Sequence, residues 1–556
     1  MKGIMNIKNF IKSAVVTLLA VCGAMTSCSD FLDKMPDNRV TLDTPNKVRD
    51  LLVSAYMDAN YAAIGELSSD NLIDNTSPDK NGVSYPLLGA QERMHEELFA
   101  WEDVKSSDQQ DSPSSVWGGA YLAISVANHA LEALDQMGND YPINEINALR
   151  GEALISRAFH HFVLVNIFSK AYRDDELSKQ DVGIPYITKP EKEVFVNYER
   201  ISVTEVYKMI EQDIIEGLPL LNDEGFSTPK YHFNEKAAYS FAARFYLFKR
   251  DYDKVIECAD IVLGQDPAGM LRSWNKDLPT FDAVKNDWAS SEISSNSMLM
   301  TSMSNFFRIF GSKYGCNRDA ADGTLFGKGP TWSGFNFHPC YSGRLYIRGS
   351  QEYGVFFPKG GEFFEYTDKI AGIGYPRVVR SEFSTEETLL CRAEAYIMKN
   401  NLQAGLKDLQ CWDDSRKATP TTDKSDFDVL TMDLVKSFYK PEATLFVKTL
   451  NASLMSPSFI ITPEQEPLIH CVLHFRRIQT IFDGMRWFDI KRFGIEIQHN
   501  IGSSTQDLLR WDDPRRAIQI PQEVISAGIE PNIRYETPDN GSGLEKFEGS
   551  VVEIEN

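Results

Sequence analysis

Cysteine is scarce in this sequence, and no two cysteines have the spacing of a metal-binding or redox pair. The 556 residues include eight Cys, none of them in a C-x-x-C pattern. A disulfide-stapled domain would need a far higher density of cysteine, and a zinc ribbon would need paired cysteines. Both classes are excluded, and most thiols are predicted to be buried apolar side chains. The sequence leaves open whether Cys316 and Cys340, in a Gly-rich segment, are bridged.

Basic residues are also few compared with acidic ones. Lys and Arg number 57 against 79 Asp and Glu, which gives a formal net charge of -22. A surface with this charge repels phosphate backbones and anionic lipid headgroups. The sequence therefore argues against nucleic acid as a partner.

Catalytic and metal-binding motifs are missing as well. There is no G-x-x-x-x-G-K-[ST] phosphate loop, and Ser333 lacks the first Gly of a nucleophile elbow. His470 and His474 have the i, i+4 spacing of a zinc helix, but no Glu follows His470. We therefore predict a protein that is not an enzyme and needs no cofactor. Whether a structural cation is bound stays open.

The N-terminal segment has the pattern of an export signal. Lys2, Lys8 and Lys12 precede a twelve-residue apolar run from Ala14 to Met25, which is too short to span a membrane. The run leads into Met25-Thr26-Ser27-Cys28, which resembles the lipobox of bacterial lipoproteins. We expect residues 1–27 to be removed and Cys28 to be acylated, for example with palmitate. The acidic stretch at 29–33 resembles a cell-surface export signal of Bacteroidetes-type lipoproteins.

Helical periodicity and capping motifs dominate much of the remaining chain. Thr44-Pro45 reads as an N-cap with Pro at the first helical position, and Ser202 with Glu205 forms a capping box. Two apolar stripes between Asn234 and Leu263, separated by a four-residue turn, predict an antiparallel helical hairpin. Ser384 to Gln410 looks like a second copy that begins with another capping box. Small Ala residues at the helix contacts resemble a tetratricopeptide unit.

A different composition separates the two hairpins. Between Thr301 and Tyr366, 16 of 66 residues are aromatic and 11 are Gly, without helical period. Long non-periodic segments of this kind are usually functional loops. We predict a mainly α fold, a tetratricopeptide-like superhelix of about four units that carries a large irregular, loop-rich ligand-binding subdomain. The expected divisions are a signal peptide (1–27), an acylated tether (28–44), a helical scaffold (45–265), the aromatic insertion (266–383) and a C-terminal repeat with signature region (384–556).

Several segments together resemble the SusD/RagB family. They occur in the family's order along nearly the whole chain: the mature start at 28–33, the helix at 152–162, the hairpin at 234–263, the helix at 389–396, the signature GMRWFDIKRFG at 484–494 and the proline motif IQIPQEVI at 518–525. Within the signature, Arg486 and Asp489 lie three residues apart and are expected to pair, with Trp487 and Phe488 packed inward.

The resemblance implies a nutrient-binding lipoprotein that faces the cell exterior from the outer membrane. It would capture oligosaccharides and deliver them to a SusC-like TonB-dependent transporter. An aromatic face can lie against the C–H face of a sugar while polar groups bind the hydroxyls. The residues that we predict to contact the ligand are Trp101, Trp288, Tyr314, Trp332 and Tyr341, with Arg318 and Arg344 as polar partners.

Three alternatives stay open at the level of sequence. Some members of the family bind peptides, so the ligand could be a peptide. A surface glycoside hydrolase would need two carboxylates that face one bond from about 5 to 10 Å apart, which a sequence does not show. A repeat scaffold that binds only proteins would have no small-molecule ligand at all.

Overall fold

A computed structural model describes residues 41–534 of the chain, except 79–81, 83, 85–91, 106–109, 139, 193–197, 309–312, 333–345, 349–353, 417–428, 441–446 and 504. The chain divides into two units, Met1–Asp43 and Thr44–Asn556, and every element named below belongs to the second. The expected signal peptide, Cys28 and nearly all of the tether lie outside the described residues.

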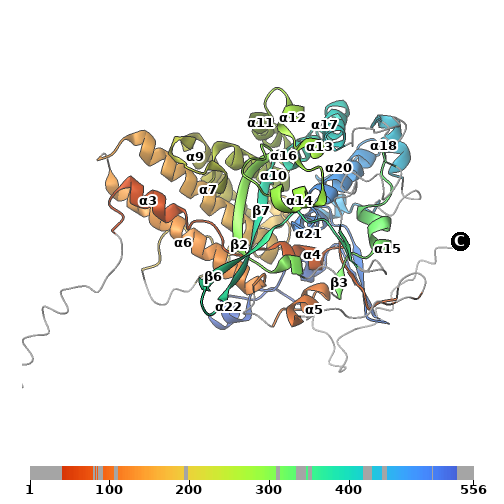
Figure 1. The fold of residues 1–556 in the computed structure, drawn as a ribbon, viewed down its shortest axis with the longest axis horizontal. Coiled ribbons are helices and arrows are strands. Elements are labelled where there is room, and N and C mark those ends of the chain that lie inside the picture. Colours follow the sequence, from red (N-terminus) through yellow and green to blue (C-terminus); the bar gives the residue numbers. More distant parts are fainter. Residues whose placement is uncertain are drawn as a thin grey trace, which may run out of the picture. The chain divides into compact units, whose positions relative to one another are not determined.

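Helices are the main regular element of the second unit (Figure 1). The longer helices are α3 (Pro45–Leu52), α6 (Pro113–Met137), α7 (Ile143–Phe168), α9 (Val203–Gly217), α10 (Glu235–Lys249), α11 (Tyr252–Leu263), α16 (Thr385–Met398), α17 (Leu402–Asp414), α20 (Glu466–Gln479) and α21 (Met485–Arg492). The shorter helices are α4 (Ala62–Ser68), α5 (Arg93–Phe99), α8 (Asp175–Ser178), α12 (Pro267–Met270), α13 (Trp274–Asp277), α14 (Phe281–Asp287), α15 (Arg318–Ala320), α18 (Met432–Phe438), α19 (Ala452–Met455) and α22 (Gln522–Ser526).

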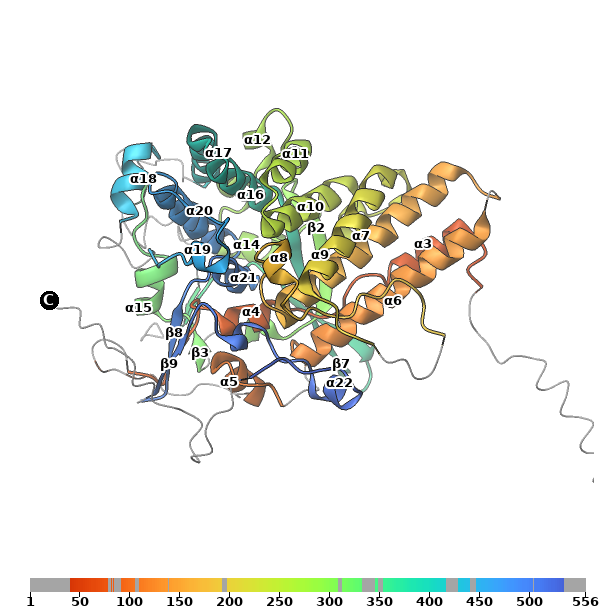
Figure 2. The same ribbon diagram turned by 180° about the vertical axis from the view of Figure 1, so that it is seen from behind.

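The helices pair as antiparallel hairpins. The pairs α6–α7, α10–α11 and α16–α17 each pack closely, and α11 packs on α16 (Figure 2). At the α10–α11 turn, the side chain of Asn234 caps α10, Arg250 adopts a left-handed conformation with φ of 66° and Asp251 caps α11. Side-chain caps satisfy backbone donors that the helix itself leaves free. The predicted mainly α, tetratricopeptide-like fold is therefore confirmed, as are both predicted hairpins.

Buried aromatic rings fill the space between the hairpins. Phe159 of α7 contacts Phe233, Phe241 of α10 and Phe383, with ring centroids 5.5 to 5.6 Å apart. All four side chains are almost fully buried. These contacts join segments from both halves of the chain, so the predicted scaffold and the C-terminal repeat share one core.

Part of the aromatic insertion forms a sheet and not only loops. Strands β2 (Asn296–Met303), β7 (Ile373–Ser384) and β6 (Glu362–Asp368) make an antiparallel sheet in the order β2-β7-β6. Two-stranded pairs are formed by β1 (Ile73–Asp74) with β3 (Tyr314–Gly315), β4 (Tyr346–Arg348) with β5 (Gly354–Phe356), and β8 (Ile497–Ile501) with β9 (Thr505–Leu509). The last residue of β7, Ser384, is the N-cap of α16, so the sheet runs directly into the second predicted hairpin.

Two local expectations are wrong. Ser384 accepts a hydrogen bond from the Glu387 backbone N–H, but the Glu387 carboxylate does not return to the cap, because Arg244 binds it. Arg486 pairs with Asp70 instead of Asp489. Trp487 and Phe488 do pack inward, as predicted.

None of the helices that the structure describes has the length and apolar character of a membrane span.

Candidate functional site

The predicted ligand-binding aromatics that the structure describes all lie in the protein interior. Trp101, Trp288, Tyr314 and Trp332 are only 3, 4, 3 and 2% exposed. The indole N–H of Trp101 donates to the Ser68 carbonyl at 2.9 Å, and its ring stacks on His499 at 4.1 Å. Such partners are typical of aromatic residues in a core.

The other rings are enclosed in a similar way. Trp288 lies under the Arg272 guanidinium, 3.9 Å from its ring centroid, and Tyr314 packs on Phe99 at 4.4 Å. The Trp332 indole donates to the Gly327 carbonyl at 2.8 Å. Ligand contact by these residues stays a prediction, and it would require the covering segments to move.

Of the two arginines predicted as polar partners, the structure describes only Arg318. Arg318 is half-buried and is the first residue of α15. Tyr341 and Arg344 lie outside the described residues, as does Cys340. The structure therefore brings none of the predicted arginines to an open aromatic face among the residues it describes.

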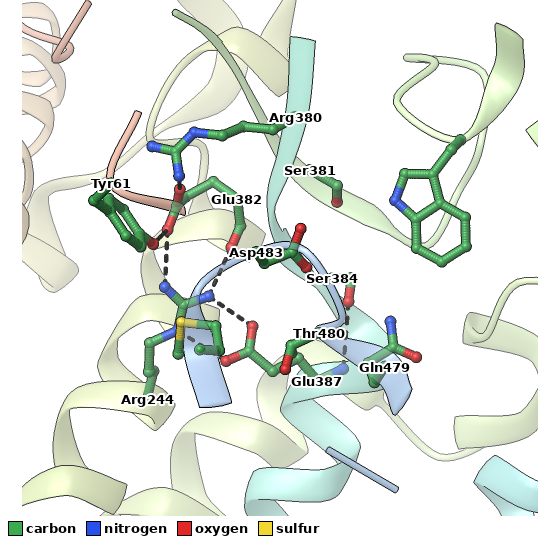
Figure 3. Close-up of a pocket in the computed structure, with 12 residues that line it drawn as sticks. Tyr61, Arg244, Arg380, Ser381, Glu382, Ser384, Glu387, Gln479, Thr480 and Asp483 are labelled. Atoms are coloured by element: carbon green, nitrogen blue, oxygen red, sulfur yellow. Dashed lines mark hydrogen bonds and ion pairs between the residues drawn. The ribbon is translucent and has the colours of Figure 1, made fainter. Parts of the chain in front are cut away.

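A buried cavity beside Trp288 is lined by charged side chains (Figure 3). Arg244 of α10 donates to Glu387 at 2.8 and 2.6 Å and to Glu382 of β7 at 2.8 Å. Tyr61 also donates to Glu382, at 2.7 Å, and Arg380 pairs with the same carboxylate at 2.7 Å. We call these five residues the charged junction.

A second group of buried charged side chains surrounds α21. Asp489 accepts hydrogen bonds from Arg476 and Arg492, and Arg492 also pairs with Glu394 of α16 at 2.7 Å. Burial raises the pKa of Asp489, but the two guanidinium groups outweigh burial and lower it below its ordinary value. Each carboxylate is already bound by a cation of the same chain. These ion pairs of the 484–494 segment connect α16, α20 and α21.

The two histidines with zinc-helix spacing are buried on α20. Tyr439 and the His474 Nδ1 atom are hydrogen-bonded at 2.8 Å, and the His470 Nε2 atom lies 3.8 Å from Glu466. Across the described ranges, no group of three or more His, Cys, Asp and Glu side chains could hold a metal ion.

A wide cleft on the surface has the character of a ligand site. It offers about 390 Å³ of space between α6, residues 185–191 with Tyr198, and α22 with the residues after it. We call it the aromatic cleft. Its lining is Trp117, Tyr121, Ile124, Ser125, Pro185, Ile187, Lys189, Glu191, Tyr198, Glu523, Val524, Ala527, Gly528 and Ile529. This volume lies within the range of about 300–1,000 Å³ that is typical of small-molecule sites.

Hydrogen bonds fix the three walls of the aromatic cleft. The Tyr121 hydroxyl donates to the Pro185 carbonyl at 2.8 Å. Arg200 donates to the carbonyls of Gly183 and Glu530 at 2.7 and 2.8 Å, so it ties the middle wall to the C-terminal wall. Tyr121 and Tyr198 are only partly buried, and Lys189, Glu191 and Glu523 are exposed at the rim. The cleft thus combines partly open aromatic rings with charged groups at its edge.

Sequence reasoning missed the aromatic cleft. Trp117, Tyr121 and Ile124 have helical spacing on one face of α6, which is a signal, but such a face is also what a core-facing helix shows. No spacing connects this face with Tyr198 or Ile529, since these residues come together only through the fold.

Comparisons with known proteins agree with this fold. Residues 30–247 match the model of a SusD-like family that is described as starch-binding and associating with the outer membrane. A putative sugar-binding protein from Bacteroides vulgatus is 16% identical, with a TM-score of 0.61 over 89% of this chain and 99% of that one. A SusD superfamily protein from Bacteroides thetaiotaomicron is 17% identical, with a TM-score of 0.58 over 89% and 100%. A laminarin-binding SusD-like protein is 15% identical, with a TM-score of 0.52 over 88% and 99%. No curated protein matches the chain.

The fold and the cleft together define the structural class of this protein. The second unit is a tetratricopeptide-like helical protein with a charged internal junction and an open cleft. The chain has the fold of SusD superfamily proteins, and the SusD-like family model matches residues 30–247, in agreement with the resemblance seen in its motifs.

Proposed function

We propose that this protein is a surface lipoprotein that captures oligosaccharides and delivers them to a SusC-like TonB-dependent transporter. Acylation at Cys28 would hold it on the outer membrane, facing the cell exterior. The observation that carries the proposal is the match of residues 30–247 to a family described as starch-binding and associating with the outer membrane. Two similar structures, described as a putative sugar-binding protein and a laminarin-binding protein, support the same ligand class.

The aromatic cleft is the place we propose for the ligand. Tyr121 and Tyr198 can offer ring faces to the C–H face of a sugar, and Lys189, Glu191 and Glu523 can bind hydroxyl groups at the rim. Nothing in this arrangement calls for a chemical step, so binding without turnover is the activity that we propose.

A peptide ligand is the second candidate, and one observation favours it. Ile124, Ile187, Val524 and Ile529 give the aromatic cleft aliphatic walls. Aliphatic side chains bind apolar groups without the stacking geometry that a sugar ring uses, so they suit the side chains of a peptide.

One screen distinguishes these candidates. A glycan array and a peptide library should be applied to the soluble form that lacks residues 1–28, and we expect oligosaccharide binding. Tyr198→Ala should then raise Kd by about 2- to 12-fold, because a stacked ring contributes about 0.5–1.5 kcal/mol. Tyr231→Ala is the matched control, since Tyr231 is 37% exposed and does not line the aromatic cleft.

Three results would contradict the proposal. Peptide binding alone would favour the second candidate. An unchanged Kd in Tyr198→Ala would move the ligand away from the aromatic cleft. Turnover of an oligosaccharide, abolished by a single Asp or Glu substitution, would make the protein a hydrolase.

A further inference from the structure

The sheet of the second unit extends into a two-stranded ribbon. Strand β2 pairs with β7 only as far as Arg377, whereas β6 pairs with β7 as far as Ile373 (Figure 1). All seven residues of β6 are exposed, and β7 becomes continuously half-buried or buried only from Pro376 onward. We call residues 362–377 the aromatic ribbon.

Large apolar side chains are unusually exposed on the aromatic ribbon. The exposed fractions are 46% for Phe363, 40% for Phe364, 51% for Tyr366, 101% for Ile370, 58% for Ile373 and 47% for Tyr375. A lone two-stranded hairpin is marginally stable in water, and exposed apolar surface of this extent marks an interaction site. The aromatic ribbon is therefore incomplete on its own.

Close contacts between its two strands fix the geometry of the aromatic ribbon. Phe364 and Tyr366 lie on one face with ring centroids 4.9 Å apart and opposite Pro376 and Gly374. A Cβ atom at Gly374 would lie 2.0 Å from the Glu365 carbonyl oxygen, so only glycine allows the two strands to approach here. At the base, Arg308 binds both carboxylate oxygens of Glu362 at 2.6 to 3.1 Å.

The outer edge of β6 adds backbone groups to this surface. Within the described residues, no strand pairs with that edge. An open edge presents a row of backbone N–H and C=O groups that a strand of another protein can bind. The aromatic ribbon thus offers both apolar contacts and strand pairing.

The exposed area indicates an occupant of protein size. With about 200 Å² for each large side chain, the exposed fractions amount to roughly 700 Å² over both faces of the aromatic ribbon, close to the ~800 Å² that each partner contributes to a standard interface. A small ligand would cover only part of this surface.

Charge argues against a second copy of this chain and against a lipid surface as the partner of the aromatic ribbon. A second copy that paired all seven residues of β6 antiparallel would place Glu365 opposite Glu365 and Glu362 opposite Asp368, and like charges in such positions repel. Both copies would also carry a net charge of -22. A lipid surface favours segments rich in Lys and Arg, whereas β6 carries three carboxylates, Glu362, Glu365 and Asp368.

We propose that the aromatic ribbon docks on the SusC-like transporter, through a protein surface that offers an open strand edge or an apolar groove with basic side chains beside it. The inference rests on the proposed function, because that function supplies the transporter. It adds the surface that makes the contact.

Two-tag co-purification from native membranes tests the docking. The full-length chain and the co-encoded transporter each carry a tag, and Phe364→Ser combined with Tyr366→Ser is compared with wild type. We expect the variant to recover about tenfold less transporter or worse, as truncation of interface hot spots does. Ile261→Ser is the matched control, since Ile261 is 58% exposed on α11, and it should recover transporter like wild type.

A photo-crosslinking phenylalanine in place of Tyr366 gives a second readout that does not depend on truncation. It should crosslink to the transporter, and the same group in place of Ile261 should not. Full recovery of transporter by the double variant, or a crosslink only to a second copy or to lipid, would overturn the proposal. Failure of wild type to recover the transporter would instead contradict the proposed function.

Discussion

At the scale of single residues, Asp111 is a buried carboxyl group with a strongly raised pKa. Its side chain is 1% exposed, and one carboxylate oxygen accepts a hydrogen bond from the Asn305 N–H at 3.0 Å. Its backbone is left-handed, with φ of 65°. Burial raises the pKa of Asp111 to about 7, although hydrogen bonds from Ser304 and Asn305 oppose the shift.

The raised pKa predicts a stability that depends on pH. The folded protein holds this proton more tightly than the unfolded chain, whose pKa is near 3.8, so the contribution is complete below pH 3.8 and is lost as pH rises to about 7. Asp111→Asn keeps an acceptor for Asn305 and tolerates the left-handed backbone. We expect the variant to gain on the order of 2–4 kcal/mol relative to wild type between pH 4 and 7.

Thermal midpoints of the soluble form at unit steps from pH 4 to 8 measure this gain. Glu257→Gln, at an exposed position of α11, is the control and should follow wild type at every pH. Parallel curves for Asp111→Asn and wild type would show that Asp111 does not carry the proton.

At the scale of elements, a local sequence pattern predicts a contact correctly only where no distant residue competes for the same group. The capping box of Ser202 and Glu205 forms because its partners are three residues apart. Glu387 has the same spacing from Ser384, yet Arg244, 143 residues away in sequence, binds its carboxylate. A buried guanidinium needs charged partners, and the sequence does not show which carboxylates the fold brings to it.

The site was less predictable than the fold for the same reason. Composition identified an aromatic segment, but it could not separate a ring in the core, such as Trp332, from a ring that lines a cleft, such as Tyr198. Exposure depends on what the other elements cover. The aromatic cleft needs three segments that are far apart in the sequence, and a helical stripe reveals only the one on α6.

Close packing of α4 against α21 gives an element-scale prediction. A Cβ atom at Gly65 would lie 2.2 Å from the Gly484 carbonyl oxygen, which is backbone and cannot turn aside. Gly65→Ala should therefore lower the free energy of unfolding by about 3 kcal/mol or more. Gly118 of α6 has no atom within 4 Å of the same position, so Gly118→Ala should instead raise it by about 0.5–1 kcal/mol.

Thermal midpoints of the two variants measure the effect of the close contact, because both variants make the same chemical change in a helix. A fall for Gly65→Ala with a rise for Gly118→Ala is the expected result. Equal shifts would mean that α4 and α21 can separate without cost, and the contact would then not hold the signature helix in place.

At the scale of the whole molecule, the aromatic cleft and the aromatic ribbon are two surfaces of one helical scaffold. The charged junction joins helices from both halves of the chain, so the aromatic cleft and the aromatic ribbon belong to a single contact network. An acidic protein of net charge -22 gains little from an anionic membrane surface, and in the proposed function its place on the membrane is set by acylation and by the transporter.

The anchoring residue can be tested in the intact cell. In a strain without the transporter, Cys28→Ala should lose lipid labelling and leave the membrane fraction, because buried acyl chains contribute about 0.8 kcal/mol per CH₂ group. Cys22→Ala is the matched control, since Cys22 lies within the apolar run before the expected cleavage point and should leave labelling unchanged. Radiolabelled palmitate and fractionation measure both outcomes. Retention of Cys28→Ala in the membrane through high-salt, detergent-free washes would show that another segment anchors the chain, and loss of label in Cys22→Ala alone would move the acylation to Cys22.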